Sequence, residues 1–149
     1  MNTNELSSMQ LFKIIHSELI MSVQYIEQDL RIIYSMLKPG DYQKNFTKVD
    51  NLLLGNLLKS LRNLDNEIGF QKFKEQDFNL LNEVRNIRNY WCHQCYLDFH
   101  YINDDEEHYN KFLEIKNRLH HDEEEVFQLQ QKIEKLRKSV VKKYKHKKK

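Results

Sequence analysis

Between residues 19 and 37 the chain carries a regular apolar stripe, and this stripe leaves little choice of local structure. Its members recur at alternating intervals of four and three residues: Leu19, Val23, Ile26, Leu30, Ile33 and Leu37. On an α-helix this spacing lines up one face, which must be buried against other helices. We expect the helix to begin near residue 5, with Ser7 or Ser8 as its cap. It should end at Lys38-Pro39-Gly40, because proline cannot continue the helical hydrogen-bond ladder.

Three further segments show helical spacing. The second helix should take Thr47 as its N-cap, the third should span residues 75–103, and the fourth should begin among the acids of residues 104–107. A break or bend in the fourth helix, if there is one, is expected at residues 120–122. The core-facing residues of the three helices are, in order, Val49, Leu53, Leu57, Leu61 and Leu64; Leu80, Val84, Ile87, Trp91 and Cys95; and Val126, Leu129, Ile133, Leu136, Val140 and Tyr144.

Glycine and proline are scarce in the chain. Three glycines and one proline in 149 residues leave little material for the hairpins of a many-stranded sheet, and this length is typical of one domain. We therefore predict an all-α fold, an antiparallel four- or five-helix bundle with long helices. Gly55 lies inside the second helix at a cost of about 1 kcal/mol relative to alanine, which indicates the close approach of another helix.

Charge divides the chain into two parts. Residues 132–149 hold ten Lys/Arg against the single acid Glu134, whereas residues 1–131 hold 14 bases and 21 acids. We interpret residues 1–131 as the helical bundle and residues 132–149 as a basic C-terminal helix end or tail. Such an end can bind a phosphate backbone by releasing counterions, and the alternative is a solvated helix end without a ligand.

Neither a membrane segment nor a secretion signal is recognisable. No run of 18 apolar residues occurs, and the first residues lack a basic start. Cys92 and Cys95 stand three apart on an expected helix, unlike the disulfide framework of a small secreted domain. We expect a cytoplasmic protein with no membrane association.

The third helix carries a polar stripe on the side away from its core face. Its members fall within about 80° on a helical wheel: Arg85, Asn89, His93, Tyr96 and His100. Arg88 lies on the flank of this stripe, about 140° from His93. One helix alone therefore does not bring Arg88 and His93 into a tight pair, and a second subunit can supply the missing half.

These side chains suit the cleavage of RNA without a metal, in which the neighbouring 2′-hydroxyl attacks the phosphorus. His93 is the candidate general acid or base, and Arg88 is the candidate for holding the phosphate and its developing charge. Asn89, one turn before His93, can orient the imidazole or bind phosphate. For Arg85 two roles are open, a second phosphate contact and a surface salt bridge with Glu83 or another acid.

Aromatic and histidine side chains complete the candidate site. Tyr96 and His100 are assigned to substrate binding, and Tyr96 can stack a base if it is exposed. Trp91 can do so too, but it belongs to the core face. Cys92 and Cys95 point in different directions and no second cysteine pair exists, so we expect no zinc site. No glycine-rich phosphate loop is present, and no cofactor is expected.

The run Arg-Asn-Tyr-Trp-Cys-His at residues 88–93 resembles the Arg-polar-x(3–5)-His motif of the HEPN superfamily, matched by Arg88, Asn89 and His93. The resemblance implies an all-α bundle and a metal-independent endoribonuclease that forms a homodimer with a composite active site. It also implies a role as a toxin with an antitoxin partner, or in antiviral defence by abortive infection. One toxin branch usually has tyrosine two residues after the histidine, where this chain has Cys95, so the chain is not assigned to that branch.

Two other classes of function remain open. The first is a catalytically inactive helical module that binds RNA or a protein through the polar stripe and the basic end. The second is a structural dimerisation partner that assembles through the apolar stripe of the first helix, in which case a charge at Ile26 or Ile33 should abolish assembly.

Overall fold

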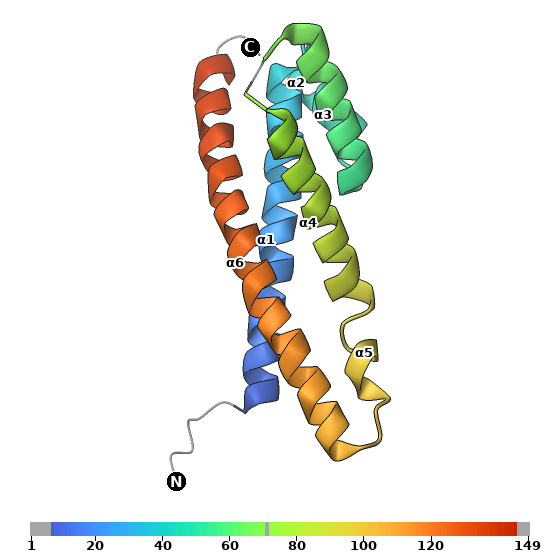
Figure 1. The fold of residues 1–149 in the computed structure, drawn as a ribbon. Coiled ribbons are helices and arrows are strands. Elements are labelled where there is room, and N and C mark those ends of the chain that lie inside the picture. Colours follow the sequence, from blue (N-terminus) through green and yellow to red (C-terminus); the bar gives the residue numbers. More distant parts are fainter. Residues whose placement is uncertain (1–6, 71, 146–149) are drawn as a thin grey trace.

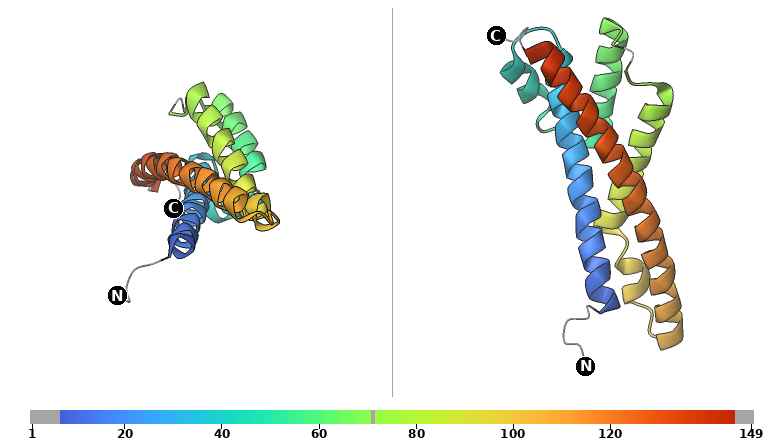
Figure 2. Two further views of the ribbon diagram at one scale, coloured as in Figure 1. Left: turned by 60° about the horizontal axis from the view of Figure 1, so that its bottom comes forward. Right: turned by 90° about the vertical axis from the view of Figure 1, so that its left-hand side faces the viewer.

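The computed structural model describes residues 7–70 and 72–145, and these residues form helices and no strand (Figure 1). The prediction of an all-α helical bundle is confirmed. The helices are α1 (Ser8–Leu37), α2 (Tyr42–Val49), α3 (Leu54–Ile68), α4 (Glu75–His93), α5 (Leu97–His100) and α6 (Asp105–Tyr144). Figure 2 shows α1 and α6 lying along each other, with α3 and α4 beside them. Of the three longest helices, α4 runs opposite to α1 and α6, which run in the same direction (Figure 1).

The core forms mainly where α1 faces α6, and the stripe predicted for the first helix is buried as expected. Ile26, Leu30 and Ile33 are fully inaccessible to solvent. Ser7 is the N-cap of α1 and forms a capping box with Gln10. Since Ile26 and Ile33 pack inside the chain's own core, the idea that their stripe is an assembly surface is wrong.

The second predicted helix starts later than expected, and a short helix precedes it. Asp41, not Thr47, is the cap there, because its side chain accepts a hydrogen bond from the Lys44 N–H at 2.9 Å and starts α2. Thr47 lies inside α2 and its hydroxyl donates to the Gln43 carbonyl. The prediction of Thr47 as an N-cap is therefore wrong, and α3 begins after Leu53, which supplies no side-chain cap.

The third predicted helix ends ten residues early, at His93. The N–H groups of Gln94 and Cys95 both bond to the Tyr90 carbonyl, at 2.9 and 3.1 Å, which breaks the regular ladder. The Trp91 carbonyl instead accepts a hydrogen bond from His16 Nε2 at 2.7 Å. A contact from α1 thus stabilises the break, and the short helix α5 follows it.

Leu80 does not belong to the core, contrary to the prediction. It is 44% exposed at the edge of an open groove between α4 and α6, whose apolar floor includes Val84, Ile87 and Leu129. Helices α4 and α6 diverge there. Leu80 therefore lies on the core-facing side of α4, but no side chain of α6 covers it. The other predicted core residues of this helix are buried, Trp91 and Cys95 included.

Helix α6 continues without a break through residues 120–122 and across the change of charge at residue 132. Ile133 and Val140 are buried, and Arg137 forms an ion pair with Asp29 of α1 at 2.9 Å. The described part of the basic end is therefore helix packed on the bundle, and residues 146–149 lie outside the described residues. Within the described chain, none of the helices has the length and apolar character needed to span a membrane.

Candidate functional site

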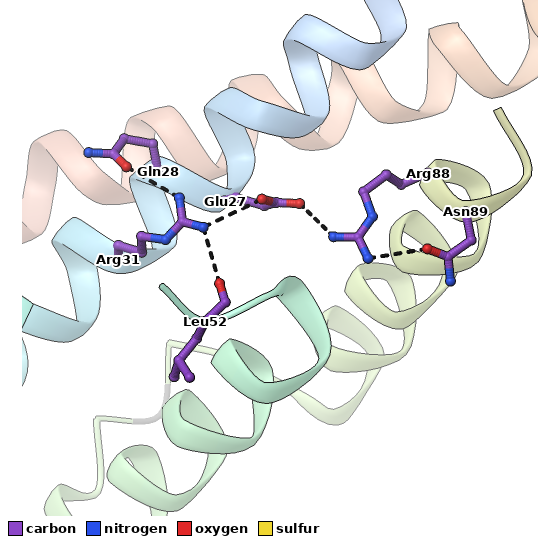
Figure 3. Close-up of polar contacts among 6 residues, drawn as sticks. All are labelled: Glu27, Gln28, Arg31, Leu52, Arg88 and Asn89. Atoms are coloured by element: carbon purple, nitrogen blue, oxygen red, sulfur yellow. Dashed lines mark hydrogen bonds and ion pairs between the residues drawn. The ribbon is translucent and has the colours of Figure 1, made fainter. Parts of the chain in front are cut away.

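Arg88 lies on the side of α4 that faces α1, and its guanidinium is held from two directions. Nη1 donates to Glu27 Oε1 at 2.9 Å, and Nη2 donates to Asn89 Oδ1 at 3.2 Å (Figure 3). The Arg88 and Glu27 side chains are 19% and 12% exposed, so the ion pair is largely withdrawn from water. The planar group therefore has little freedom, and its remaining N–H donors are available in a defined direction.

Glu27 connects Arg88 to a second arginine. It lies 3.5 Å from Arg31 Nη2, which also donates to the Leu52 carbonyl just before α3 at 3.1 Å (Figure 3). One carboxylate thus stands between two guanidinium groups, and the network joins α1, α4 and the start of α3. Glu27 is not among the residues that the sequence predicted for the site. Its four-residue spacing from Arg31 on the flank of the buried stripe was the available signal.

A cleft of about 300 Å³ opens between the start of α3 and the middle of α4, beside this network. Its cationic lining residues are Lys59, Arg85 and Arg88, and its amide side chains are Asn56 and Asn89. None of the lining residues carries a carboxylate. The cleft is therefore a positively charged site with amide hydrogen-bonding groups, which is the chemistry that recognises phosphate.

Arg85 owes its position in the cleft to Gly55. A Cβ added at Gly55 would lie 3.3 Å from three atoms of the Arg85 guanidinium, so the group rests flat against the glycine backbone. The close approach predicted at Gly55 is confirmed, and the approaching group is a side chain from α4. Among the residues that the structure describes, no acid forms the surface salt bridge considered for Arg85, and Glu83 lies on the opposite flank of α4, in the groove facing α6.

The structure brings Arg85, Arg88 and Asn89 together, but it leaves His93 outside the cleft lining. His93 is the last residue of α4 and is exposed. Within the described residues it makes no hydrogen bond to Arg88 or Asn89. The large angular separation of Arg88 and His93 inferred from the helical wheel therefore persists in the folded chain.

Tyr96 and His100 lie beyond the break after α4, so they no longer continue the polar stripe. The Tyr96 ring packs on α1, with centroids 5.7 Å from Phe12 and 5.4 Å from His16, and the residue is 36% exposed. His100 contacts Tyr101, with ring centroids 4.8 Å apart. The expectation that Tyr96 and His100 share one helical face with Arg85 and Asn89 is wrong, because α4 ends between them.

Trp91 is a core residue and is 1% exposed. Its Nε1 donates to Asp122 Oδ2 of α6 at 2.9 Å. The same carboxylate also lies near Arg118 and His121. The indole is therefore unavailable for stacking on a base, and it links α4 to α6 through a buried hydrogen bond.

The two cysteines differ in environment. Cys95 is buried, its thiol donates to the Trp91 carbonyl, and burial raises its pKa to about 11. Cys92 is exposed. Within the described chain, the candidate metal ligands that cluster are His121, Asp122 and Glu125 of α6, whose ligand atoms lie within 4.8 Å of one another. Because Asp122 already accepts a hydrogen bond from Trp91, one member of this cluster has a structural role.

Comparison with protein-family models, with curated proteins and with solved structures yields no match. The resemblance to the HEPN superfamily therefore rests on the motif of Arg88, Asn89 and His93 within an all-helical chain and remains a prediction.

Proposed function

We propose that this protein is a metal-independent endoribonuclease of the HEPN type that acts in the cytoplasm. The observation that carries the proposal is the placement of Arg88 and Asn89 together on the wall of a cationic cleft, with the Arg88 guanidinium fixed by Glu27. A fixed guanidinium stabilises charge that develops on a phosphate without reorganising during the reaction. RNA is the substrate that this arrangement suits best.

In the proposed reaction the 2′-oxygen of RNA forms a bond to phosphorus, and the bond from phosphorus to the 5′-oxygen of the next nucleotide breaks. A base takes the proton from the 2′-hydroxyl, an acid protonates the leaving 5′-oxygen, and the product carries a cyclic phosphate. His93 takes part as the acid or the base, and Arg88 binds the non-bridging oxygens, whose negative charge increases in the transition state. Asn89 donates its amide N–H to the same phosphate.

His93 reaches this phosphate from a second copy of the chain. The support is geometric, because on one chain His93 is exposed at the end of α4 while Arg88 faces α1. A homodimer with two composite sites is therefore part of the proposal. A toxin with an antitoxin partner, or an antiviral defence protein acting by abortive infection, is the biological role that such an activity suits.

The experiment is incubation of purified protein with unstructured RNA in EDTA, followed by analysis of the product ends. The wild-type chain should cut and leave cyclic phosphates, and His93→Ala should lose cutting while it still binds RNA. His120→Ala, at an exposed histidine of α6, is the matched control and should cut normally. Equal cutting by His93→Ala and the wild type would contradict the proposal.

A second candidate function is a non-catalytic RNA-binding module. The Arg88–Glu27 ion pair favours it, because a guanidinium satisfied at 2.9 Å by a largely buried carboxylate can serve mainly to fasten α4 to α1. Firm RNA binding by the wild-type chain without any cleavage in EDTA would establish this function in place of the first.

A further inference from the structure

We infer that Lys59 and Arg85 form a second phosphate subsite, which binds the phosphodiester next to the one held by Arg88, and that the substrate is single-stranded RNA. The inference rests on the proposed function, since it concerns the strand that Arg88 would hold. Lys59 and Asn56 come from α3, which the motif at residues 88–93 does not include. The subsite therefore adds a second helix to the candidate interface.

The cleft is positively charged, although residues 1–131 as a whole carry a net negative charge. Residues 1–131 hold 14 bases and 21 acids, so a lining of average composition would contain more carboxylates than cations. This cleft has three cations and no carboxylate among its lining residues. Glu27, the nearest acid that the contacts show, stands behind Arg88 and is shared with Arg31. The surplus positive charge therefore faces the cleft.

The cations of the subsite are free to bind a ligand. No described residue accepts a hydrogen bond or forms an ion pair with Arg85 or Lys59, whereas Arg88 is already bonded to Glu27 and Asn89. Arg85 is nevertheless positioned, because its guanidinium lies against Gly55. A donor group that is held in place and has no partner binds an anion with little loss of side-chain entropy.

The geometry matches successive phosphates of one strand. Arg85 and Arg88 are three residues apart on α4, on neighbouring turns, and both line the cleft, so one strand can contact both side chains. A cleft of about 300 Å³ is at the small end of ligand sites and accommodates a phosphate with its sugar. An unpaired strand can bend a phosphate into such a hollow, whereas the backbone of a duplex follows a fixed convex path.

The test measures binding separately from cleavage. A fluorescent single-stranded 2′-O-methyl RNA cannot be cut by attack of its 2′-oxygen, and its binding is followed by anisotropy at several salt concentrations. Lys59→Gln and Arg85→Gln should each weaken binding about five- to tenfold at low salt, and each should reduce the slope of log K against log salt by about 0.7. Lys13→Gln, at an exposed lysine of α1 outside the cleft, should leave both quantities unchanged.

Gly55→Ala provides a variant that keeps every charge. Its methyl group would displace the Arg85 guanidinium by a few tenths of an ångström or more, so binding should weaken although the charge is the same. If Lys59→Gln and Arg85→Gln bind like Lys13→Gln, the subsite is refuted even where the wild-type chain cuts RNA. A duplex bound as tightly as the single strand would overturn the choice of substrate. If the wild-type chain binds RNA without cutting it, and the cleft variants bind more weakly, the subsite is retained and the proposed ribonuclease activity is rejected.

Discussion

Glu27 is the residue whose removal should most affect the candidate site, because it stands between two arginines. Glu27→Gln keeps the shape of the side chain and one hydrogen-bond acceptor but removes the charge. Arg88 and Arg31 would then face each other without the carboxylate that lies 2.9 and 3.5 Å from them. The substitution tests whether this carboxylate fixes the guanidinium of Arg88.

The expected cost follows from the burial of the pair. Breaking a buried ion pair by removing one partner costs about 3–5 kcal/mol. The Glu27 and Arg88 side chains are 12% and 19% exposed, so the pair is not fully buried. The amide oxygen of the introduced glutamine can also still accept one hydrogen bond. We therefore expect the lower end of that range, a loss of about 3 kcal/mol in the free energy of unfolding. With a slope of about 2 kcal/mol per molar urea, the midpoint should fall by about 1.5 M.

The assay is urea unfolding followed by far-ultraviolet circular dichroism, and the chain offers a matched control. Glu134 also lies between two cations, 3.1 Å from Lys138 and 3.8 Å from Arg137, but its side chain is 38% exposed. Glu134→Gln should cost less than about 1 kcal/mol, because water and salt screen an exposed pair. If Glu27→Gln costs no more than Glu134→Gln, the reasoning that Glu27 fixes Arg88 is refuted.

Three other predictions concern stability and reactivity. Burial acts to raise the pKa of Asp77, but the hydrogen bond from Lys132, the backbone N–H at the N-cap of α4 and nearby positive charge hold it below its usual value. Its stabilisation is therefore present above about pH 4 and is lost as the pH falls further, so the melting temperature between pH 6 and pH 3 should drop more for the wild type than for Asp77→Asn. A thiol reagent should label Cys92 quickly and Cys95 only in urea, and equal rates in the native protein would contradict the burial of Cys95. Gly55→Ala should change the free energy of unfolding by no more than about 1 kcal/mol, because the gain in helix propensity offsets the displaced guanidinium; a larger loss in urea unfolding would show that the contact is rigid.

Features that depend on local spacing were predictable from the sequence. The buried stripe of α1 follows from a period that any helix imposes, and Trp91 falls on the core face for the same reason. Gly55 could be flagged as a close approach because glycine is costly inside a helix. The group that approaches it, a guanidinium 30 residues further along the chain, could not be identified from α3 alone.

Features that depend on distant contacts were not predictable. Where α4 ends at His93, the freed Trp91 carbonyl is bonded by His16, which lies 75 residues away in the chain. The pairing of Arg88 with Glu27 spans 61 residues, so the motif at residues 88–93 gave no hint of it. The exposure of Leu80 likewise reflects the divergence of α4 from α6, which a helical wheel does not contain.

A mixing experiment tests most directly whether Arg88 and His93 cut RNA together from two subunits. Arg88→Met and His93→Ala, each first shown to fold and to be inactive alone, are mixed under conditions that exchange subunits and are assayed on unstructured RNA in EDTA. Half of the randomly formed dimers are mixed and each has one complete site of two, so about a quarter of the wild-type rate should return. A mixture that forms mixed dimers and stays as inactive as its components would contradict the composite site.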